Sequence, residues 1–174
     1  MGHLDPSKRG MEMEVRNKKL LEISANIERD IQAFYNELAS HISDIITKKH
    51  LLLMAKDRAQ YENQFQSLLE EKGCLKYGWE NNTALRELID KHFKQGLFPS
   101  LEGVMKNLSK FEGILKALTI SKKCEELTVK LYGTLKKNCK DFETKALLSN
   151  LEAKGKSHCD FLQTSINHWE KHSI

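Results

Sequence analysis

Apolar residues recur at three- and four-residue steps over most of the chain, which is the spacing of amphipathic helices. We expect a first long helix from about Met13 to Ser43, with apolar positions at Val15, Leu20, Ile23, Ile27, Ile31, Phe34, Leu38 and Ile42. Asp44 is placed to cap a second helix, which is expected to end near Lys72, before Gly73. The apolar face of this helix is expected to carry Ile45, Leu52, Ala55, Phe65 and Leu68. The turn between the two helices is short, so they are expected to be antiparallel neighbours.

The second half of the chain repeats this pattern. An offset of 97 residues pairs Glu28 with Glu125, Tyr35 with Tyr132, Leu38 with Leu135, Leu21 with Leu118, Ser24 with Ser121, Asp44 with Asp141, Leu51 with Leu148 and Tyr61 with His158. Two more long helices are therefore expected, over about Lys110–Asn138 and Asp141–His172. In each copy the Glu and the Tyr stand seven residues apart, close to two helical turns, so they lie on one face. That face carries the apolar residues, and both glutamates are expected to point into the core.

Residues 73–109 have no counterpart in the repeat and are interpreted as a crossover connection. Short helical content is expected where Leu85, Leu88, Ile89 and Phe93 share a face, and the pattern breaks at Gly96 and Pro99. Such a length allows the second and third helices to run parallel, because the chain must return about 40 Å along helices of this length. We expect one all-α domain over residues 13–172, built from hairpins 13–72 and 110–172. Residues 1–12 lack the periodicity and are interpreted as a flexible tail.

The segment from Glu28 to Leu38, followed by the run around residues 44–61, resembles the ferritin-like superfamily, and its rubrerythrin-type members most closely. The resemblance covers roughly residues 13–172. It implies an antiparallel four-helix bundle with one long crossover and a diiron centre held by a Glu on each of two helices and a Glu-x-x-His on each of the other two. The Glu-x-x-His positions are occupied here by Arg58 and Tyr61 in the first repeat, and by Gly155 and His158 in the second. Three of the six ligand positions implied by the family are therefore retained: Glu28, Glu125 and His158.

The charges of these residues favour a core without metal. Four glutamates would supply a charge of −4 to two divalent metals, whereas Glu28 and Glu125 supply −2 and an inward Arg58 returns +1. Adding two divalent ions to this set would bury an uncompensated positive charge, which costs several kcal/mol per ion. We expect the Arg58 guanidinium to reach across the space that Gly155 leaves and to fork onto both glutamates. Tyr61 is expected to donate a hydrogen bond to a carboxylate.

Composition argues against several classes of protein, including nucleic-acid-binding and membrane-spanning proteins. The chain has 28 basic and 24 acidic residues dispersed along every segment, so no patch indicates nucleic-acid binding. Its longest apolar run, from Leu51 to Ala55, is far too short to span a membrane and is interpreted as a buried helix face. The four cysteines form no Cys-x-x-Cys pair, which excludes the rubredoxin-like module of rubrerythrins proper. The chain shows no leader peptide, so a cytoplasmic location and free thiols are expected.

Two functions follow from these observations. The first is a non-catalytic binding or scaffold protein, without cofactor, in which Glu28, Arg58, Glu125, Tyr35, Tyr132, Tyr61, Gly155 and His158 form or border an internal polar network. The second is a rubrerythrin-like oxidoreductase that reacts with peroxide or oxygen, in which Glu28, Glu125 and His158 hold one iron, manganese or zinc ion. That alternative requires Arg58 to face away from the metal. A protein partner and a homodimer both remain open.

Overall fold

The computed structural model describes residues 6–73, 75–94 and 96–172, and for residues 6–16 it describes the backbone alone. These residues contain six helices and no β-strand. The helices are α1 (Pro6–His41), α2 (Ile45–Lys72), α3 (Thr83–His92), α4 (Leu101–Met105), α5 (Lys110–Lys137) and α6 (Phe142–Lys171). The all-α class is thereby confirmed.

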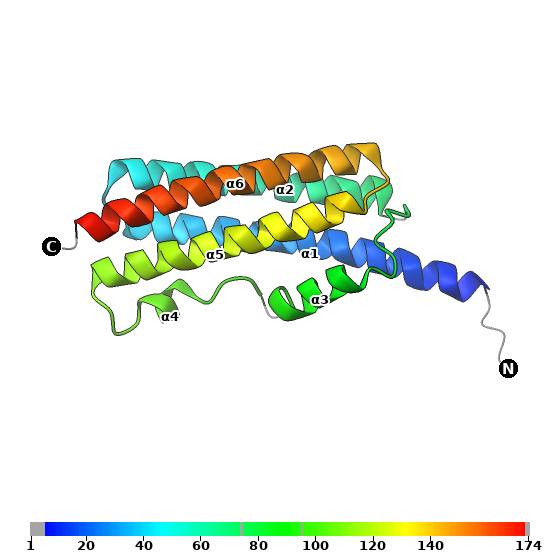
Figure 1. Cartoon of the computed structure of the whole chain (residues 1–174), viewed down its shortest axis with the longest axis horizontal. Coiled ribbons are helices and arrows are strands. Elements are labelled where there is room, and N and C mark those ends of the chain that lie inside the picture. Colours follow the sequence, from blue (N-terminus) through cyan, green and yellow to red (C-terminus); the bar gives the residue numbers. More distant parts are fainter. Residues whose placement is uncertain (1–5, 74, 95, 173–174) are drawn as a thin grey trace.

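Four long helices, α1, α2, α5 and α6, lie side by side, while the two short ones lie along one flank (Figure 1). Helices α2 and α5 run in the same direction. The segment that connects them, residues 73–109, therefore extends back along the length of the bundle. Each long hairpin is closely packed within itself, α1 against α2 and α5 against α6. The buried apolar side chains form one continuous core to which all six helices contribute.

Side-chain caps account for most of the helix starts. Asp44 accepts a hydrogen bond from the Thr47 backbone N–H at 2.7 Å, and Asp141 accepts one from the Thr144 N–H at 2.9 Å. Ser109 and Glu112 form a reciprocal capping box at the start of α5. The boundaries expected for the second, third and fourth long helices are therefore confirmed to within one or two residues.

The first helix begins earlier than the sequence pattern indicated. Helix α1 starts at Pro6, so residues 6–12, interpreted from sequence as tail, have a helical backbone. Proline is compatible with a first helical turn because its fixed φ suits the helix and its missing N–H would have no partner there. Helix α1 has 36 residues, against 28 in α2 and in α5. Its first turns project beyond the bundle (Figure 1).

The buried face of α2 also differs from the expectation. Ile45 and Leu52, which were assigned to the core face, are 66% and 43% exposed. Leu53, within the run interpreted as a buried face, is 59% exposed. The residues that α2 buries are Thr47, Leu51, Met54, Ala55, Arg58, Tyr61 and Phe65. The start of α2 is apolar on several sides, so its hydrophobic pattern does not identify the side that faces α1 and α6.

Gly73 ends α2 in a different way from the one expected. Its φ is −59°, so it is not the left-handed glycine that often follows a helix. A side chain at this position would instead bring a Cβ to 2.5 Å from the Leu69 carbonyl oxygen. Glycine is therefore favoured at residue 73 by a close approach of backbone rather than by a positive φ.

The crossover is held to the bundle by two aromatic residues that the sequence pattern did not single out. Tyr77 and Trp79 are buried and stacked on each other, with ring centroids 4.5 Å apart. The Trp79 indole N–H donates to the Leu135 carbonyl oxygen at 2.9 Å, and the Tyr77 hydroxyl donates to the Lys72 carbonyl oxygen at 2.8 Å. Helix α3 then begins after its cap Asn82, in the segment where short helical content was expected. These contacts fix where α3 lies against the long helices.

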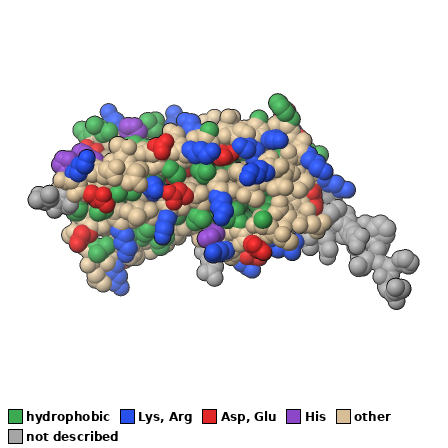
Figure 2. Space-filling view, viewed as in Figure 1, with side chains coloured by type: hydrophobic (Ala, Val, Ile, Leu, Met, Phe, Trp, Pro, Cys, Tyr) green, Lys and Arg blue, Asp and Glu red, His purple; other side chains and the backbone are tan. Residues whose placement is uncertain are grey.

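The surface carries charges of both signs interspersed over the face shown in Figure 2. Among the described residues, no helix is both long enough and apolar enough to cross a membrane. Cys124, Cys139 and Cys159 are free thiols, and burial raises the pKa of Cys124 to about 12. These thiols are therefore protonated at neutral pH and are poor nucleophiles.

Candidate functional site

A buried arginine lies between two buried glutamates at the centre of the bundle. The Arg58 Nη1 is 3.1 and 3.2 Å from the two carboxylate oxygens of Glu28. Its Nη2 donates to Oε2 of Glu125. All three side chains are 0% exposed. One guanidinium therefore joins two carboxylates from opposite hairpins in the interior of the protein.

Each long helix contributes at least one residue to the polar cluster around Arg58. Glu28 comes from α1, Arg58 from α2, Glu125 from α5 and His158 from α6. The Nδ1 atom of His158 lies 3.2 Å from Arg58 Nη2 and 3.5 Å from Glu125 Oε1. We name these four residues, with Tyr35 and Tyr132, the ionic cluster. A cluster shared among four helices constrains how all of them pack.

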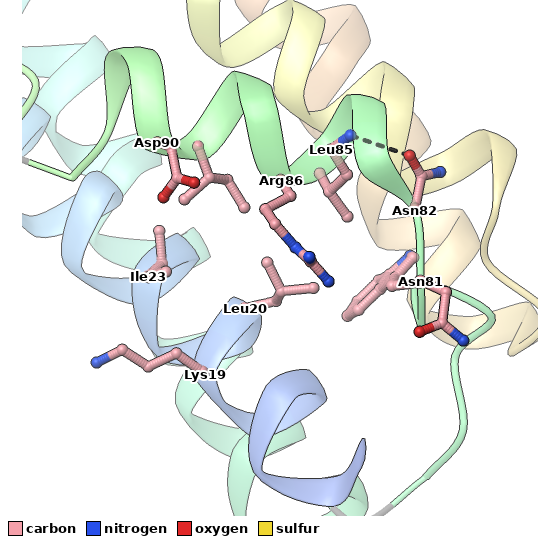
Figure 3. A pocket seen from close by; sticks show the side chains of 10 residues that line it. Lys19, Leu20, Ile23, Asn81, Asn82, Leu85, Arg86 and Asp90 are labelled. Carbon is pink, nitrogen blue, oxygen red and sulfur yellow. Dashed lines mark hydrogen bonds between the residues drawn. The ribbon is translucent and has the colours of Figure 1, made fainter. Parts of the chain in front are cut away.

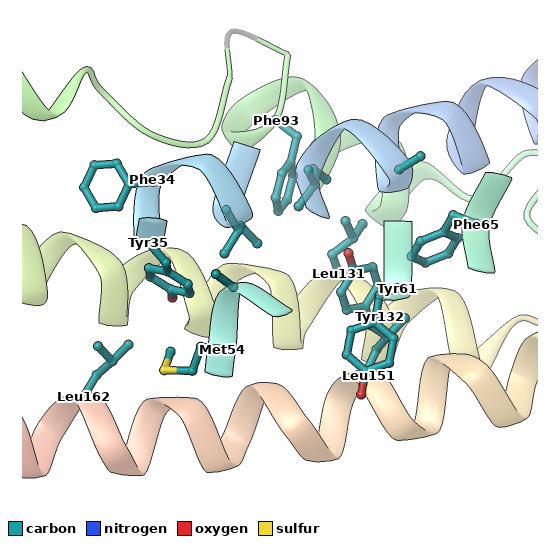
Figure 4. Close-up of a cluster of buried hydrophobic side chains, with 14 of the residues drawn as sticks. Phe34, Tyr35, Met54, Tyr61, Phe65, Phe93, Leu131, Tyr132, Leu151 and Leu162 are labelled. Atoms are coloured by element: carbon teal, nitrogen blue, oxygen red, sulfur yellow. The ribbon is translucent and has the colours of Figure 1, made fainter. Parts of the chain in front are cut away.

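The two tyrosines complete the cluster in a reciprocal way. The Tyr35 hydroxyl, on the first hairpin, donates to Glu125 Oε1 on the second at 2.5 Å. The Tyr132 hydroxyl, on the second hairpin, donates to Glu28 Oε1 on the first. Figure 4 shows Tyr35 and Tyr132 at separate levels along the interior. The sequence placed each Tyr on the face of its own Glu, but the hydrogen bonds cross between the hairpins.

Burial and the charge of Arg58 shift the pKa values of Glu28 and Glu125 in opposite directions. Burial raises the pKa of Glu28 above its ordinary value and outweighs the opposing effects of Arg58 and Tyr132. Burial acts on Glu125 in the same direction, but Arg58, His158 and Tyr35 together outweigh it and lower the pKa of that carboxyl. Glu125 is therefore the ionised partner of Arg58, and Glu28 is the carboxyl of the cluster that takes up a proton more readily.

Arg58 and the two tyrosines of the cluster keep their protons. Burial acts to lower the pKa of Arg58, but the charges of Glu125 and Glu28 outweigh it and the guanidinium stays charged. Burial, together with the neighbouring carboxylates, raises the pKa of both tyrosines well above the ordinary value. Tyr35 and Tyr132 thus remain hydrogen-bond donors. The Nε atom of Arg58 is buried without a hydrogen-bond partner among the described residues.

His158 connects the cluster to the surface. Its Nε2 lies 3.5 Å from Asp57 Oδ2, and Asp57 also pairs with Lys154 at 3.3 Å. Asp57 and Lys154 line an open cleft of about 630 Å³ between α2 and α6. The sequence analysis missed this pair, although a signal was present. Asp57 and Lys154 are separated by the same 97 residues that separate the matched positions of the repeat, and they carry opposite charges.

Tyr61 does not take the role expected from sequence. It is 8% exposed and lines the cleft between α2 and α6, and among the described residues no hydrogen bond joins it to Glu28 or Glu125. Tyr132 and Tyr35 already supply the hydroxyl donors to the two carboxylates. Tyr61, at the position where the resemblance implies a histidine, is therefore part of the wall of the cleft.

Gly155 is also used differently from the expectation. A Cβ added there would lie 2.6 Å from Val129 Cγ2 and 3.7 Å from Glu125 Oε2. The space left by the missing side chain is thus filled mainly by Val129 of α5, and Arg58 reaches the carboxylates without it. Glycine at residue 155 allows α5 and α6 to approach closely at the level of the cluster.

Replacing Gly155 by alanine is expected to destabilise the protein by about 1–3 kcal/mol, because the added methyl overlaps Val129. The better helix propensity of alanine, worth about 1 kcal/mol, offsets only part of the cost of this overlap. Gly133→Ala on α5 is the matched control, because its Cβ would meet only Glu152 at an ordinary 3.7 Å, and this variant should be unchanged or more stable. Urea denaturation measures both. A stable Gly155→Ala variant, or one that Val129→Ala fails to rescue, would contradict the assigned contact.

The metal-ligand assignment drawn from the family resemblance does not fit this geometry. No group of three or more His, Cys, Asp and Glu side chains in the described part of the chain is arranged to hold a metal ion. Between Glu28 and Glu125 lies the guanidinium of Arg58, a cation that contacts both. Arg58 does not face away, as the single-metal alternative requires. What the arrangement does chemically is to neutralise buried charge through ion pairs and hydrogen bonds.

Comparisons with known proteins identify a fold but no family. No protein-family model matches the chain, and no curated protein matches its sequence significantly. The structure is similar to that of a hypothetical protein from Pyrococcus furiosus, with a TM-score of 0.69 and 19% sequence identity. The similarity covers 91% of this chain and 92% of the archaeal one. At this level of identity the likeness shows a shared fold alone.

Proposed function

We propose that this chain is a ferritin-like, rubrerythrin-type bundle whose metal site has been replaced by an internal salt bridge, and that it acts as a non-catalytic binding or scaffold protein. The observation that carries the proposal is the position of the Arg58 guanidinium. It contacts Glu28 and Glu125, the carboxylates that would bridge two metals in such a bundle. A guanidinium bound to both carboxylates leaves them no free coordination sites facing each other.

The charges of the cluster support the same conclusion. Two carboxylates and one guanidinium sum to −1, and one proton on Glu28 brings the interior to zero. Two divalent metals added to the same side chains would bring the sum to +3 with both carboxylates ionised. The effective cost of burying an unpaired ion is several kcal/mol, so the arginine-bridged state is the balanced one.

The arrangement of the helices gives further support. Helices α2 and α5 run in the same direction, joined by one long crossover, which is the connection that a ferritin-like bundle uses. Positions related by the 97-residue offset also share their environments. Leu51 and Leu148 are both 0% exposed, while the hydroxyls of Ser24 and Ser121 each donate to a carbonyl oxygen one turn earlier. These correspondences favour two related hairpins.

Metal analysis tests the proposal. Protein produced with iron, manganese and zinc in the medium, and purified without chelator, is expected to contain well below one metal per chain. A variant with the family ligands restored is expected to bind two: Arg58→Glu, Tyr61→His and Gly155→Glu, with Val129→Ala to make room for the new side chain. Adding Glu28→Ala to this variant is the control and should abolish the binding.

Either of two results would overturn the proposal. One is wild-type protein that carries one or two metals per chain and loses them in Glu125→Gln, which would favour the oxidoreductase alternative. The other is a restored variant that folds, as judged by circular dichroism, and still binds no metal. That result would remove the link between this bundle and the ferritin-like site.

A further inference from the structure

A second cleft lies between α1 and α3. It is lined by residues of α1, of the segment before α3 and of α3 itself. Its volume is about 240 Å³. Its floor is apolar: Trp79 and Leu85 are 4% and 2% exposed, and Leu20, Ile23 and Ile89 pack against the core around them. The indole N–H of Trp79 is already used in a hydrogen bond to Leu135, so the tryptophan offers the cleft an apolar ring. The apolar side chains that reach the surface of the cleft are therefore those of Leu20, Ile23 and Ile89, which are only partly buried.

One end of this cleft is cationic. Figure 3 shows the Arg86 side chain extending from α3 across the opening towards Leu20 of α1, while the Lys19 side chain, on the α1 wall, points away from Arg86. Among the described residues Arg86 forms no ion pair, and Lys19 has only a distant one, 3.8 Å from Glu22. The acidic residue of the cleft, Asp90, is 3.7 Å from Lys94. A guanidinium at the mouth of an apolar hollow is therefore free to bind an anion.

We propose that the cleft between α1 and α3 binds a small monocarboxylate with a compact apolar body, such as an arylacetate. The apolar body would lie against Leu20, Ile23 and Ile89, above the buried Trp79 and Leu85, and the carboxylate would bind Arg86. An apolar cavity of about 150 Å³ is enough to hold benzene, so a cavity of about 240 Å³ has room for a ring with a short acidic arm.

Charge selects the anion over a neutral ligand of the same size. A neutral apolar ligand would cover the guanidinium of Arg86 and remove its water without giving it a partner, and this desolvation is unfavourable. A carboxylate accepts two parallel N–H bonds from the planar guanidinium, which are stronger than bonds between neutral groups.

This inference does not rest on the proposed function. The lining residues of the cleft include none of the ionic cluster, so a failed metal prediction leaves the cleft unaffected, and the reverse holds as well. If both are correct, the cleft is a ligand site of a protein whose interior has no catalytic metal.

Titration of the full-length protein with phenylacetate tests the inference. Binding is expected to be saturable at millimolar concentration and to shift the NMR signal of the Trp79 indole N–H. The signal of Trp169, which packs against Phe111 of α5, is the internal reference and should not move. Phenylacetamide, the neutral analogue, should bind at least about tenfold more weakly, because it lacks the charge that Arg86 recognises.

Two variants with equal change in charge locate the site. Arg86→Gln should weaken phenylacetate binding at least about tenfold, since it removes the charged fork. Lys91→Gln, exposed on the same helix but outside the lining, should leave it unchanged. Leu20→Trp, which fills the hollow, should abolish binding. The inference is overturned by the absence of saturable binding, by equal affinity for the amide, or by equal affinity of Arg86→Gln and Lys91→Gln. Each of these outcomes removes either the site or its selectivity for an anion.

Discussion

Replacing Arg58 by leucine is expected to lower the free energy of unfolding by about 3–5 kcal/mol, because removing one partner of a buried ion pair leaves the others uncompensated. Glu28 and Glu125 would then face each other in an apolar interior without a cation. Urea denaturation at neutral pH measures the change. A loss of this size is a large share of the total stability of a domain, which is typically about 5–15 kcal/mol.

The same variant should recover stability as the pH is lowered from about 7 towards 5. Without Arg58, burial and mutual repulsion raise the pKa of both carboxyls above the ordinary value for glutamate, about 4.3. Between that value and the raised pKa, the folded state binds more protons than the unfolded chain, so stability increases as the pH falls. Of the two cluster carboxyls in the wild type, Glu28 has a raised pKa, whereas that of Glu125 is lowered. The wild type should therefore gain less over this range.

Two controls separate the buried charge from other effects. Arg29→Leu removes an arginine that is 55% exposed and paired with Glu62, and should cost less than about 1 kcal/mol. Adding Glu28→Gln and Glu125→Gln to Arg58→Leu removes the charges and should restore part of the loss. If Arg58→Leu were as stable as the wild type at all pH values, the guanidinium could not be the cation that compensates these carboxylates.

The two glutamates are expected to respond unequally to neutralisation. Glu125→Gln should destabilise the protein by about 3–5 kcal/mol, because it removes the ionised partner of Arg58. Glu28→Gln should cost less than about 1.5 kcal/mol, because burial raises the pKa of Glu28 and the amide oxygen can still accept a hydrogen bond from Tyr132. Thermal or urea unfolding of the two variants at neutral pH gives the comparison.

The difference between the two variants is the informative quantity. Both replacements are nearly isosteric and both positions are fully buried, so packing effects largely cancel. Equal losses would mean that Arg58 is shared evenly and that the asymmetry in carboxyl pKa does not exist. A larger loss in Glu28→Gln would reverse the assignment of the ionised partner.

Much of the fold could be predicted because its signals are local. Asp44 and Asp141 cap helices by accepting hydrogen bonds from backbone N–H groups three residues away, so sequence alone indicates those starts. The start of α1 at Pro6 could not be predicted in this way, since a helix that projects beyond its neighbours needs no apolar periodicity there. The exposed side of α2 was misjudged because Ile45 and Leu52 are apolar without being covered.

The candidate site could also be predicted only as far as its features depend on spacing within one helix. Matched glutamates on apolar faces predicted that Glu28 and Glu125 would face the core, and the Arg58 contact followed from charge balance. The tyrosine donors that serve them, and the contact of Gly155 with Val129, depend on how the two hairpins are placed against each other. Side-chain spacing within a helix carries no information about that placement. Tyr61 was misjudged for this reason.

The crossed hydrogen bonds of Tyr35 and Tyr132 bear on how the chain assembles. Neither hairpin contains the hydroxyl that its own glutamate requires, because each donor is supplied by the opposite one. A half-assembled intermediate, with one hairpin formed and the other unfolded, would therefore lack both hydrogen bonds and the ion pair between Arg58 and Glu125, and would expose the apolar face of its hairpin to water. Such a species is disfavoured, so the two halves depend on each other energetically. The bundle should accordingly unfold in one cooperative transition, although its hairpins are joined by a long connection.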